Sequence, residues 1–237
     1  DITVEDVYNS FSLGIGRDGV AGYPLINAYL TGKELKLVAE VDASVSDFMT
    51  TARLYCSGLN FTFNPHRMIL NKVTDCYLTR EDGERIEIQD DQLYRVVTDL
   101  YTGQMLGSVM EMSYGLLKIE PKDKDGNPIE NLEDQAIMEG DKELKAWDAI
   151  ARYMQSFDDT DGDGIANVSE YYATTHDRKV VDDSKNILDL VKKPNKFTAI
   201  IVCIGLIIII IIVLVVSLIR KIVRKSRKKK NIHNTNR

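Results

Sequence analysis

Residues 198–219 read TAIIVCIGLIIIIIIVLVVSLI, a run of 22 residues without a formal charge in which isoleucine, valine and leucine dominate. At about 1.5 Å of helical rise per residue the run would reach roughly 33 Å, and the hydrocarbon core of a bilayer is about 30 Å thick. A helix buried in a soluble protein is rarely this long and apolar on every side. We therefore predict a single transmembrane helix over residues 198–219.

The charges on either side of this span predict its orientation. Residues 220–230, RKIVRKSRKKK, hold eight lysines and arginines and no acid, whereas the bases that closely precede the span are Lys192, Lys193 and Lys196. The cytoplasmic flank of a membrane span usually carries the excess of such bases. We expect a single-pass cell-membrane protein with its basic tail, residues 220–237, in the cytoplasm and its larger N-terminal part outside the cell.

The acidic charge of the N-terminal part limits its partners. The whole chain has a net charge of −6, but residues 198–237 hold nine bases and no acid, so the first 197 residues stand at −15. Such a surface argues against nucleic-acid binding. A stop-transfer signal attracted to anionic membrane lipid explains the basic tail, although a nucleic-acid or lipid-specific role of the tail stays open.

The beginning of the chain leads to a further expectation. The sequence opens at Asp1, without an initiator methionine or a signal peptide. A protein whose large N-terminal part is exported and whose anchor lies at the C-terminus normally needs a signal in front. We expect this chain to be the C-terminal portion of a longer exported protein.

Upstream of the span the sequence alternates between helical and strand-like patterns, which predicts an α+β domain. In residues 3–9, Thr3 and Asp6 are spaced for a capping box at the start of a short helix. Apolar and polar residues alternate from Leu59 to Phe63, as is typical of a half-buried strand. By similar arguments we expect strands at 23–30, 53–64, 67–79, 86–88, 94–101 and within 115–129, and helices at 33–49 and 143–157.

Two cysteines fall in the predicted strands 53–64 and 67–79. A tight hairpin centred near residue 66 would place Cys56 almost opposite Cys76. In an oxidising compartment such a pair could form a disulfide if its geometry allows, and the alternative is two small buried strand residues. Cys203 lies in the span and is interpreted as an apolar residue.

Three short motifs follow one another in residues 2–110. They are Thr-Gly-x-x-Leu-Lys, as Thr31, Gly32, Leu35 and Lys36; Ser-Gly-Leu-x-Phe-x-Phe-Asn-Pro, over residues 57–65; and Tyr-x-Val, as Tyr94 and Val96. In this order they resemble the C-terminal domain of bacterial exported 5′-nucleotidases of the metallophosphatase superfamily. The resemblance implies a mixed sheet with helices.

The resemblance also implies partners and a site. In this family an N-terminal domain holds a pair of divalent metal ions and the C-terminal domain supplies substrate contacts. The implied partners are thus the N-terminal metallophosphatase domain of the parent chain and a small phosphate-ester substrate. The substrate-binding positions match Leu13 and Gly14, where the family has Phe-Gly, and Tyr101 and Gly103, at a loop after the Tyr-x-Val strand. Both stacking aromatics of the family are absent and Tyr101 is a nearby substitute, so a phosphate ester other than a nucleotide stays open.

We assign no catalytic residue to this chain. Two-metal hydrolysis needs a set of Asp, His and Asn ligands that hold ions about 3.5–4 Å apart. His66 and His176 are the only histidines before the span, and neither is flanked by a ligand-type pattern. We therefore do not expect the chain to be active alone.

One candidate metal site remains, in the sequence DTDGDGIANVSE of residues 159–170. Its spacing is that of an EF-hand-like calcium loop, in which positions 1, 3, 5, 7, 9 and 12 supply oxygen ligands and position 6 is glycine. The six ligand positions are Asp159, Asp161, Asp163, Ile165, Asn167 and Glu170. A solvated acidic turn is the alternative interpretation, because no second loop is available to pair with this one.

These observations predict five segments. They are a 5′-nucleotidase C-terminal-like domain over 1–142, an amphipathic helix and acidic calcium-type loop over 143–172, a juxtamembrane linker over 173–197, the transmembrane helix over 198–219 and the basic tail over 220–237. The leading hypothesis is the substrate-binding region of a cell-surface, metal-dependent phosphoester hydrolase. The alternatives are a non-enzymatic surface binding or stalk module and an anchored solute sensor, the latter disfavoured because no signalling domain follows the span.

Overall fold

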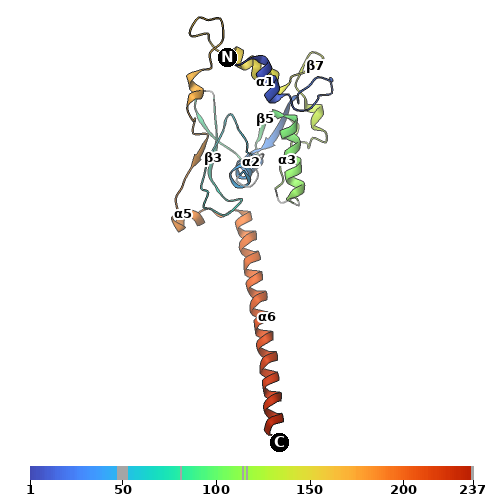
Figure 1. Ribbon diagram of the computed structural model, residues 1–237, viewed down its shortest axis with the longest axis vertical. Coiled ribbons are helices and arrows are strands. Elements are labelled where there is room, and N and C mark those ends of the chain that lie inside the picture. Colours follow the sequence, from blue (N-terminus) through green and yellow to red (C-terminus); the bar gives the residue numbers. More distant parts are fainter. Residues whose placement is uncertain (47–52, 81, 114, 116, 236–237) are drawn as a thin grey trace.

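The computed structural model describes residues 1–46, 53–80, 82–113, 115 and 117–235. It is a mixture of helices and sheets, followed by one long helix that leaves the domain (Figure 1), and the predicted α+β class is confirmed. The elements are α1 (Val4–Phe11), β1 (Leu25–Thr31), α2 (Gly32–Val45), β2 (Leu59–Phe63), β3 (Val73–Thr79), β4 (Arg85–Glu87), β5 (Leu93–Asp99), α3 (Leu100–Met112), β6 (Met138–Glu139), β7 (Lys142–Glu143), α4 (Ala146–Gln155), β8 (Lys179–Val181), α5 (Ile187–Val191) and α6 (Lys196–Thr235), with 3₁₀ turns at Leu132–Gln135 and Glu170–Ala173.

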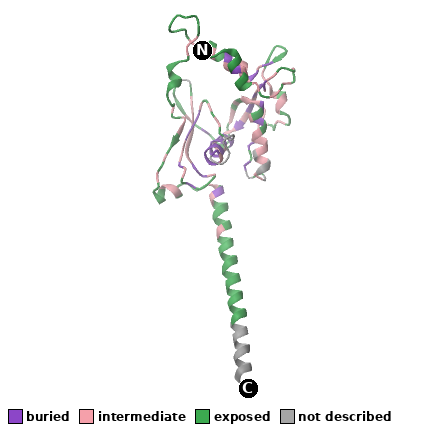
Figure 2. Ribbon diagram, viewed as in Figure 1, coloured by how far each residue is buried: buried purple, intermediate pink, exposed green. Residues whose placement is uncertain are grey.

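Helix α2 is the centre of the domain. A capping box starts it: the Thr31 hydroxyl accepts the Glu34 N–H, and the Glu34 carboxylate accepts the Thr31 N–H at 2.8 Å. Leu35 and Val38 face one hydrophobic cluster with β1, whereas Ala39 belongs to a second cluster with β2. Figure 2 shows this helix largely buried, in contrast to residues 198–223 of α6, most of which are exposed. The helix therefore joins the two halves of the core.

Two sheets contact this helix. Strands β1 and β5 pair antiparallel, with Leu25 opposite Asp99 and Thr31 opposite Leu93. The larger sheet has the order β4-β3-β2-β8, in which β8 pairs parallel to β2. Strands β6 and β7 form a separate short pair. Strand β8 comes from the segment predicted to be a linker, so part of 173–197 belongs to the folded domain.

The predicted pairing of Cys56 with Cys76 is wrong in register. Cys76 lies opposite Phe61, and Cys56 precedes β2. The cause is the long connection from Asn64 to Lys72, where the prediction assumed a tight hairpin. Both cysteines are free thiols packed against the second core cluster. Burial raises the pKa of the Cys76 thiol to about 12, so this thiol stays protonated at neutral pH.

Two further predictions on secondary structure are corrected. The loop expected after β5 is helix α3, because the Asp99 carboxylate accepts the Thr102 N–H at 2.9 Å and its hydroxyl at 2.7 Å, as a helix cap does. The strand expected within 115–129 is absent among its described residues. Lys122 makes only isolated bridges there, one of them with Tyr29, before a turn from Asp123 to Asn127.

Helix α6 contains the predicted span. Residues Lys196–Val223 form, among the described residues, one helix that is long and apolar enough to cross a membrane. Its second residue, Phe197, is 4% exposed and lies in the first core cluster beside Leu30 and Ile119. Just before it, the Asn195 side chain accepts the N–H groups of Phe197 and Thr198. The span is therefore attached to the domain core without a free linker.

Candidate functional site

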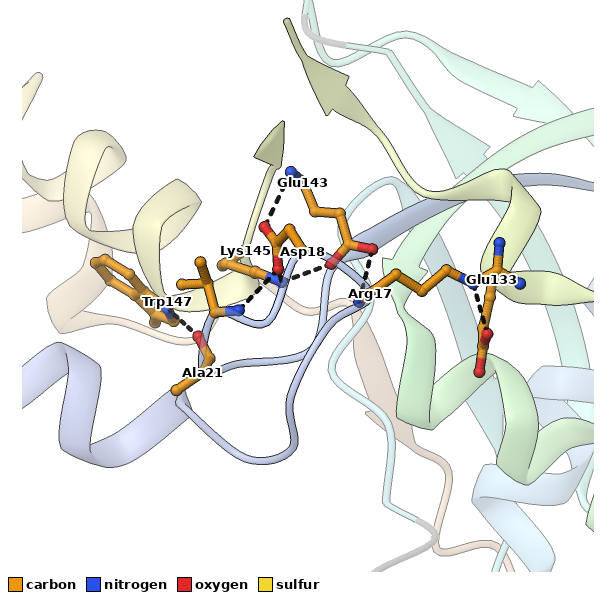
Figure 3. A network of polar contacts seen from close by, with 8 residues as sticks. Arg17, Asp18, Ala21, Glu133, Glu143, Lys145 and Trp147 are labelled. Atoms are coloured by element: carbon orange, nitrogen blue, oxygen red, sulfur yellow. Dashed lines mark hydrogen bonds and ion pairs between the residues drawn. The ribbon is translucent and has the colours of Figure 1, made fainter. Parts of the chain in front are cut away.

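The glycine-rich loop of residues 12–22 is the starting point of the candidate site. It turns back on itself through Gly22 N–H to Gly14 carbonyl and Tyr23 N–H to Leu13 carbonyl hydrogen bonds of 2.9 and 2.8 Å. The loop is also held from outside, because Trp147 of α4 donates its indole N–H to the Ala21 carbonyl at 3.1 Å (Figure 3). The loop is thus a fixed part of the domain surface.

A buried ion cluster fixes the same loop. Lys145, with a side chain only 3% exposed, reaches the Asp18 carboxylate at 2.8 Å and the Glu143 carboxylate at 2.5 Å (Figure 3). The Glu143 carboxylate also accepts the Arg17 N–H at 3.1 Å. The hydrogen bond from Lys145, followed by that from the Val20 N–H, lowers the pKa of Asp18 from 3.8 to about 2. No local sequence pattern marks this cluster, since its two halves are about 125 residues apart.

Gly14 and Tyr101, two of the predicted substrate-binding residues, both lie against the ring of Tyr23, which the sequence analysis missed. Tyr23 stacks on Tyr101, with centroids 5.9 Å apart and an angle of 25° between the rings. Gly14 lies against the ring of Tyr23: a Cβ at this glycine would come within 2.7 Å of three ring atoms. Tyr101 is 43% exposed. Two aromatic rings therefore form one partly exposed surface beside the glycine-rich loop, which we name the tyrosine surface (Gly14, Tyr23, Tyr101).

The other two predicted residues are placed differently. Leu13 is exposed and follows α1 next to Gly14. Gly103 is buried in the first turn of α3, where a Cβ would come within 2.6 Å of the Ile26 side chain. Gly103 therefore allows α3 to pack on β1 and faces the interior, whereas Leu13 faces solvent.

The candidate calcium loop brings three of its six predicted ligands together. Carboxylate oxygens of Asp159, Asp161 and Asp163 lie within 4.8 Å of one another. Two hydrogen bonds to Asp159, from the N–H groups of Gly164 and Gly162, lower the pKa of its carboxyl. Oxygens at these separations fit a Ca²⁺ ion, whose ligands lie about 2.3–2.6 Å from it.

Of the remaining predicted ligands, Asn167 lies next to that group, since its amide N–H donates to the Asp161 carboxylate at 3.5 Å. The Asn167 amide oxygen accepts the Thr160 N–H at 2.6 Å and so braces the loop. Glu170 begins the 3₁₀ turn and lines a cavity of about 640 Å³ together with the rings of Tyr153, Phe157 and Tyr172. Ile165 is exposed and would offer its carbonyl oxygen. A bound ion would need Glu170 to approach the three aspartates.

A second cavity, of about 810 Å³, lies between α2, β3 and the start of α6. It is lined by charges of both signs, and several of them pair with each other: Lys122 reaches Glu34 at 2.6 Å and Lys118 reaches Glu120 at 3.1 Å. Because of these pairs, the described lining residues form no cluster of like charges that would define a class of ligand. The cavity therefore gives no functional assignment.

The helices and sheets form an α+β domain that carries the tyrosine surface. This domain is attached directly to a candidate membrane helix. Residues 1–113 match the family model described as "5′-nucleotidase, C-terminal domain". The match confirms the resemblance of this part of the chain to the 5′-nucleotidase C-terminal domain, which the short motifs had indicated.

Among solved structures the chain is similar to the 5′-nucleotidase precursor from Thermus thermophilus, with 17% sequence identity and a TM-score of 0.48 over 77% of this chain. It is also similar to the NAD nucleotidase of Haemophilus influenzae, with 22% identity and a TM-score of 0.37 over 52% of this chain. The chain spans 28% and 21% of the lengths of these two proteins. No curated protein matches the chain.

Proposed function

We propose that this chain is the substrate-binding C-terminal region of a cell-surface, metal-dependent phosphoester hydrolase of the 5′-nucleotidase type. The family match over residues 1–113 carries the proposal. In it, the catalytic pair of divalent metal ions belongs to an N-terminal metallophosphatase domain of the parent chain, and the small phosphate-ester substrate is held between the two domains. The residues of this chain bind and orient the substrate and carry out no bond cleavage themselves.

The tyrosine surface supports the substrate-binding role. It offers a stacked aromatic pair, Tyr23 and Tyr101, and an aromatic face contributes about 1–3 kcal/mol per stacked base. A planar base on the substrate is therefore the group that this surface suits.

The test is a phosphatase screen of the parent protein over nucleoside monophosphates and sugar phosphates, with Tyr101→Leu and a control variant. Tyr172→Leu is the matched control, because Tyr172 is 44% exposed but lies in another cluster. We expect Tyr101→Leu to raise KM for nucleotides with little change in kcat, while Tyr172→Leu leaves KM unchanged. Absence of phosphatase activity on every ester would reject the hydrolase and favour the alternative, a surface binding or stalk module.

We further propose that α6 crosses the cell membrane with the basic tail inside. The bases from Arg220 to Lys230 support this orientation. The test is labelling of a cysteine placed at Asn234 with an impermeant maleimide on intact cells. Labelling only after the cells are opened is the expected result, and labelling of intact cells would contradict the orientation.

We also propose that residues 159–170 bind Ca²⁺, with Asp159, Asp161 and Asp163 as ligands. Loops of this kind in extracellular modules bind with a dissociation constant of about 10⁻⁴–10⁻³ M. Calorimetric titration of the whole chain with CaCl₂ tests the site. Asp161→Asn should abolish the heat of binding, whereas the exposed Asp141→Asn should not change it. No heat in the unaltered chain would reject the site and leave a solvated acidic turn.

A further inference from the structure

Helix α5 and the loop before β3 expose a group of apolar side chains at one end of the domain. Leu188 is 68% exposed, although leucine is a residue that usually lies in a core. The group, named here the basal surface, consists of Met68, Ile69, Ile187, Leu188 and Val191, all of them exposed. An exposed apolar group of this kind marks a surface that contacts another phase or protein.

The basal surface is fixed in position relative to α6. Arg67, buried in the loop, donates to the carbonyl oxygens of Asp189 and Lys192, both at 2.5 Å. The Asn195 side chain donates to the Leu70 carbonyl at 2.5 Å and also accepts the Phe197 N–H at the start of α6. The loop, α5 and the start of α6 are therefore one hydrogen-bonded unit.

The unit formed by the loop, α5 and the start of α6 is also joined to the core, so its position relative to the domain is fixed. Phe197, two residues after Asn195, is buried in the first core cluster. Figure 1 shows α5 at the same end of the domain as the beginning of α6. The uncharged run starts at Thr198, directly after this point. When residues 198–219 lie in hydrocarbon, α5 is consequently held at the level of the lipid headgroups.

The charge of this end of the chain differs from the rest of the outer part. Residues 185–197 contain four lysines and one acid, Asp189, whereas the first 197 residues together stand at −15. One of the lysines, Lys192, pairs with Asp189 at 2.7 Å. Basic residues beside an apolar face are typical of segments that lie in a membrane interface. An acidic domain would otherwise be repelled by an anionic membrane surface.

We propose that the basal surface is a second membrane contact, which lies in the headgroup region of the outer leaflet next to the span. The occupant is lipid, because the surface is continuous with a helix that enters lipid and lies among the lysines of residues 185–197. The contact fixes the orientation of the domain, with the N-terminal helix α1 directed away from the bilayer (Figure 1). The inference rests on the proposed membrane location of α6.

The test uses nitroxide labels on the full chain in vesicles of phosphatidylcholine and phosphatidylglycerol, in a background that lacks the native cysteines. Leu188→Cys is the probe, and Ile187→Cys is a second probe on the same helix. Leu13→Cys is the matched control: Leu13 is 65% exposed, nearly the value for Leu188, but directly follows α1. Collision with lipid-soluble oxygen and with a water-soluble nickel complex reports the surroundings of each label.

We expect the labels at 187 and 188 to lose most of their collisions with nickel and to gain collisions with oxygen relative to the label at 13. Equal nickel access at 13, 187 and 188 would overturn the proposal. A label on Cys203 as the only cysteine distinguishes failure of the membrane span from failure of the basal contact. If this label lies in lipid while the labels at 187 and 188 do not, the span stands and the basal contact fails. Spin–spin broadening at 188 that grows with the protein-to-lipid ratio would indicate a second copy and would also overturn the lipid contact.

Discussion

Two loops of similar composition behave in opposite ways in this protein. Residues 12–22, SLGIGRDGVAG, and residues 159–170, DTDGDGIANVSE, are both rich in glycine and contain aspartate. In the first loop Asp18 has a protein cation, the buried Lys145. In the second, three aspartates face one another, and their hydrogen bonds come from the loop's own backbone and amide groups. The first loop thus takes its cation from a distant part of the chain, whereas the second holds three carboxylates together with hydrogen bonds from the loop itself.

The largest effect should come from removing the cation of the first loop. Lys145→Met leaves the buried Glu143 carboxylate without its partner, and breaking such a pair costs about 3–5 kcal/mol. Denaturant unfolding measures the loss. The control is Lys118→Met, since the exposed pair with Glu120 should contribute only about 0–1 kcal/mol. A cost as small as that of the control would mean that the loop does not depend on Lys145.

The next largest effect should come from calcium, which we expect to stabilise the second loop and not the first. At an ion concentration 100 times the dissociation constant, binding to the folded state alone stabilises it by about 2.7 kcal/mol. Hydrogen exchange should slow at residues 158–173 when Ca²⁺ is added and should stay unchanged at residues 12–22. Asp161→Asn should remove the protection, and protection that persists in this variant would place the ion elsewhere.

Replacing a glycine by alanine should cost more stability in the first loop than in the second, because only the first glycine is packed against a side chain. Gly14 and Gly162 both have positive φ, 81° and 79°, so alanine is strained at either position. Only the Gly14 Cβ would meet a ring, that of Tyr23, whereas nothing lies within 4 Å of a Cβ at Gly162. Gly14→Ala should therefore cost about 1–3 kcal/mol more than Gly162→Ala in thermal unfolding. Equal costs would show that Tyr23 moves away without penalty.

The smallest expected effect is on pH dependence. The pKa of Asp18 is lowered in the folded state, so its contribution to stability is fully present above the ordinary value of 3.8 and is lost as the pH falls towards about 2. Asp18→Asn should flatten the loss of stability over this window in acid unfolding curves. Asp141→Asn, an exposed control, should leave the curve unchanged. A curve as steep in Asp18→Asn as in the unaltered chain would contradict the role of Asp18.

Local signals predicted much of the fold. Thr3 caps α1 as expected, and the helices α2 and α4 and the strand β2 lie where local patterns predicted them. These features depend on residues a few positions apart. Family motifs, which combine such local patterns, led to the 5′-nucleotidase C-terminal domain for the same reason.

Features formed between distant residues could not be predicted. Strand β8 has three residues and pairs with β2, about 118 positions earlier, so no local pattern marks it. The register of Cys76 was wrong because it depends on the length of the loop from Asn64 to Lys72. In the candidate site the family pattern points to Gly14 and Tyr101, but their common neighbour Tyr23 is brought there by the pairing of β1 with β5, which no local pattern predicts.

The burial of Phe197 in the core has a mechanical consequence. Because the span and the domain share this side chain and no free joint separates them, any inclination of the span also inclines the domain. A membrane helix changes its inclination when bilayer thickness changes. In the proposed membrane arrangement, a change in lipid thickness would therefore act on the tyrosine surface through Phe197, against the hold of the basal surface on the lipid headgroups.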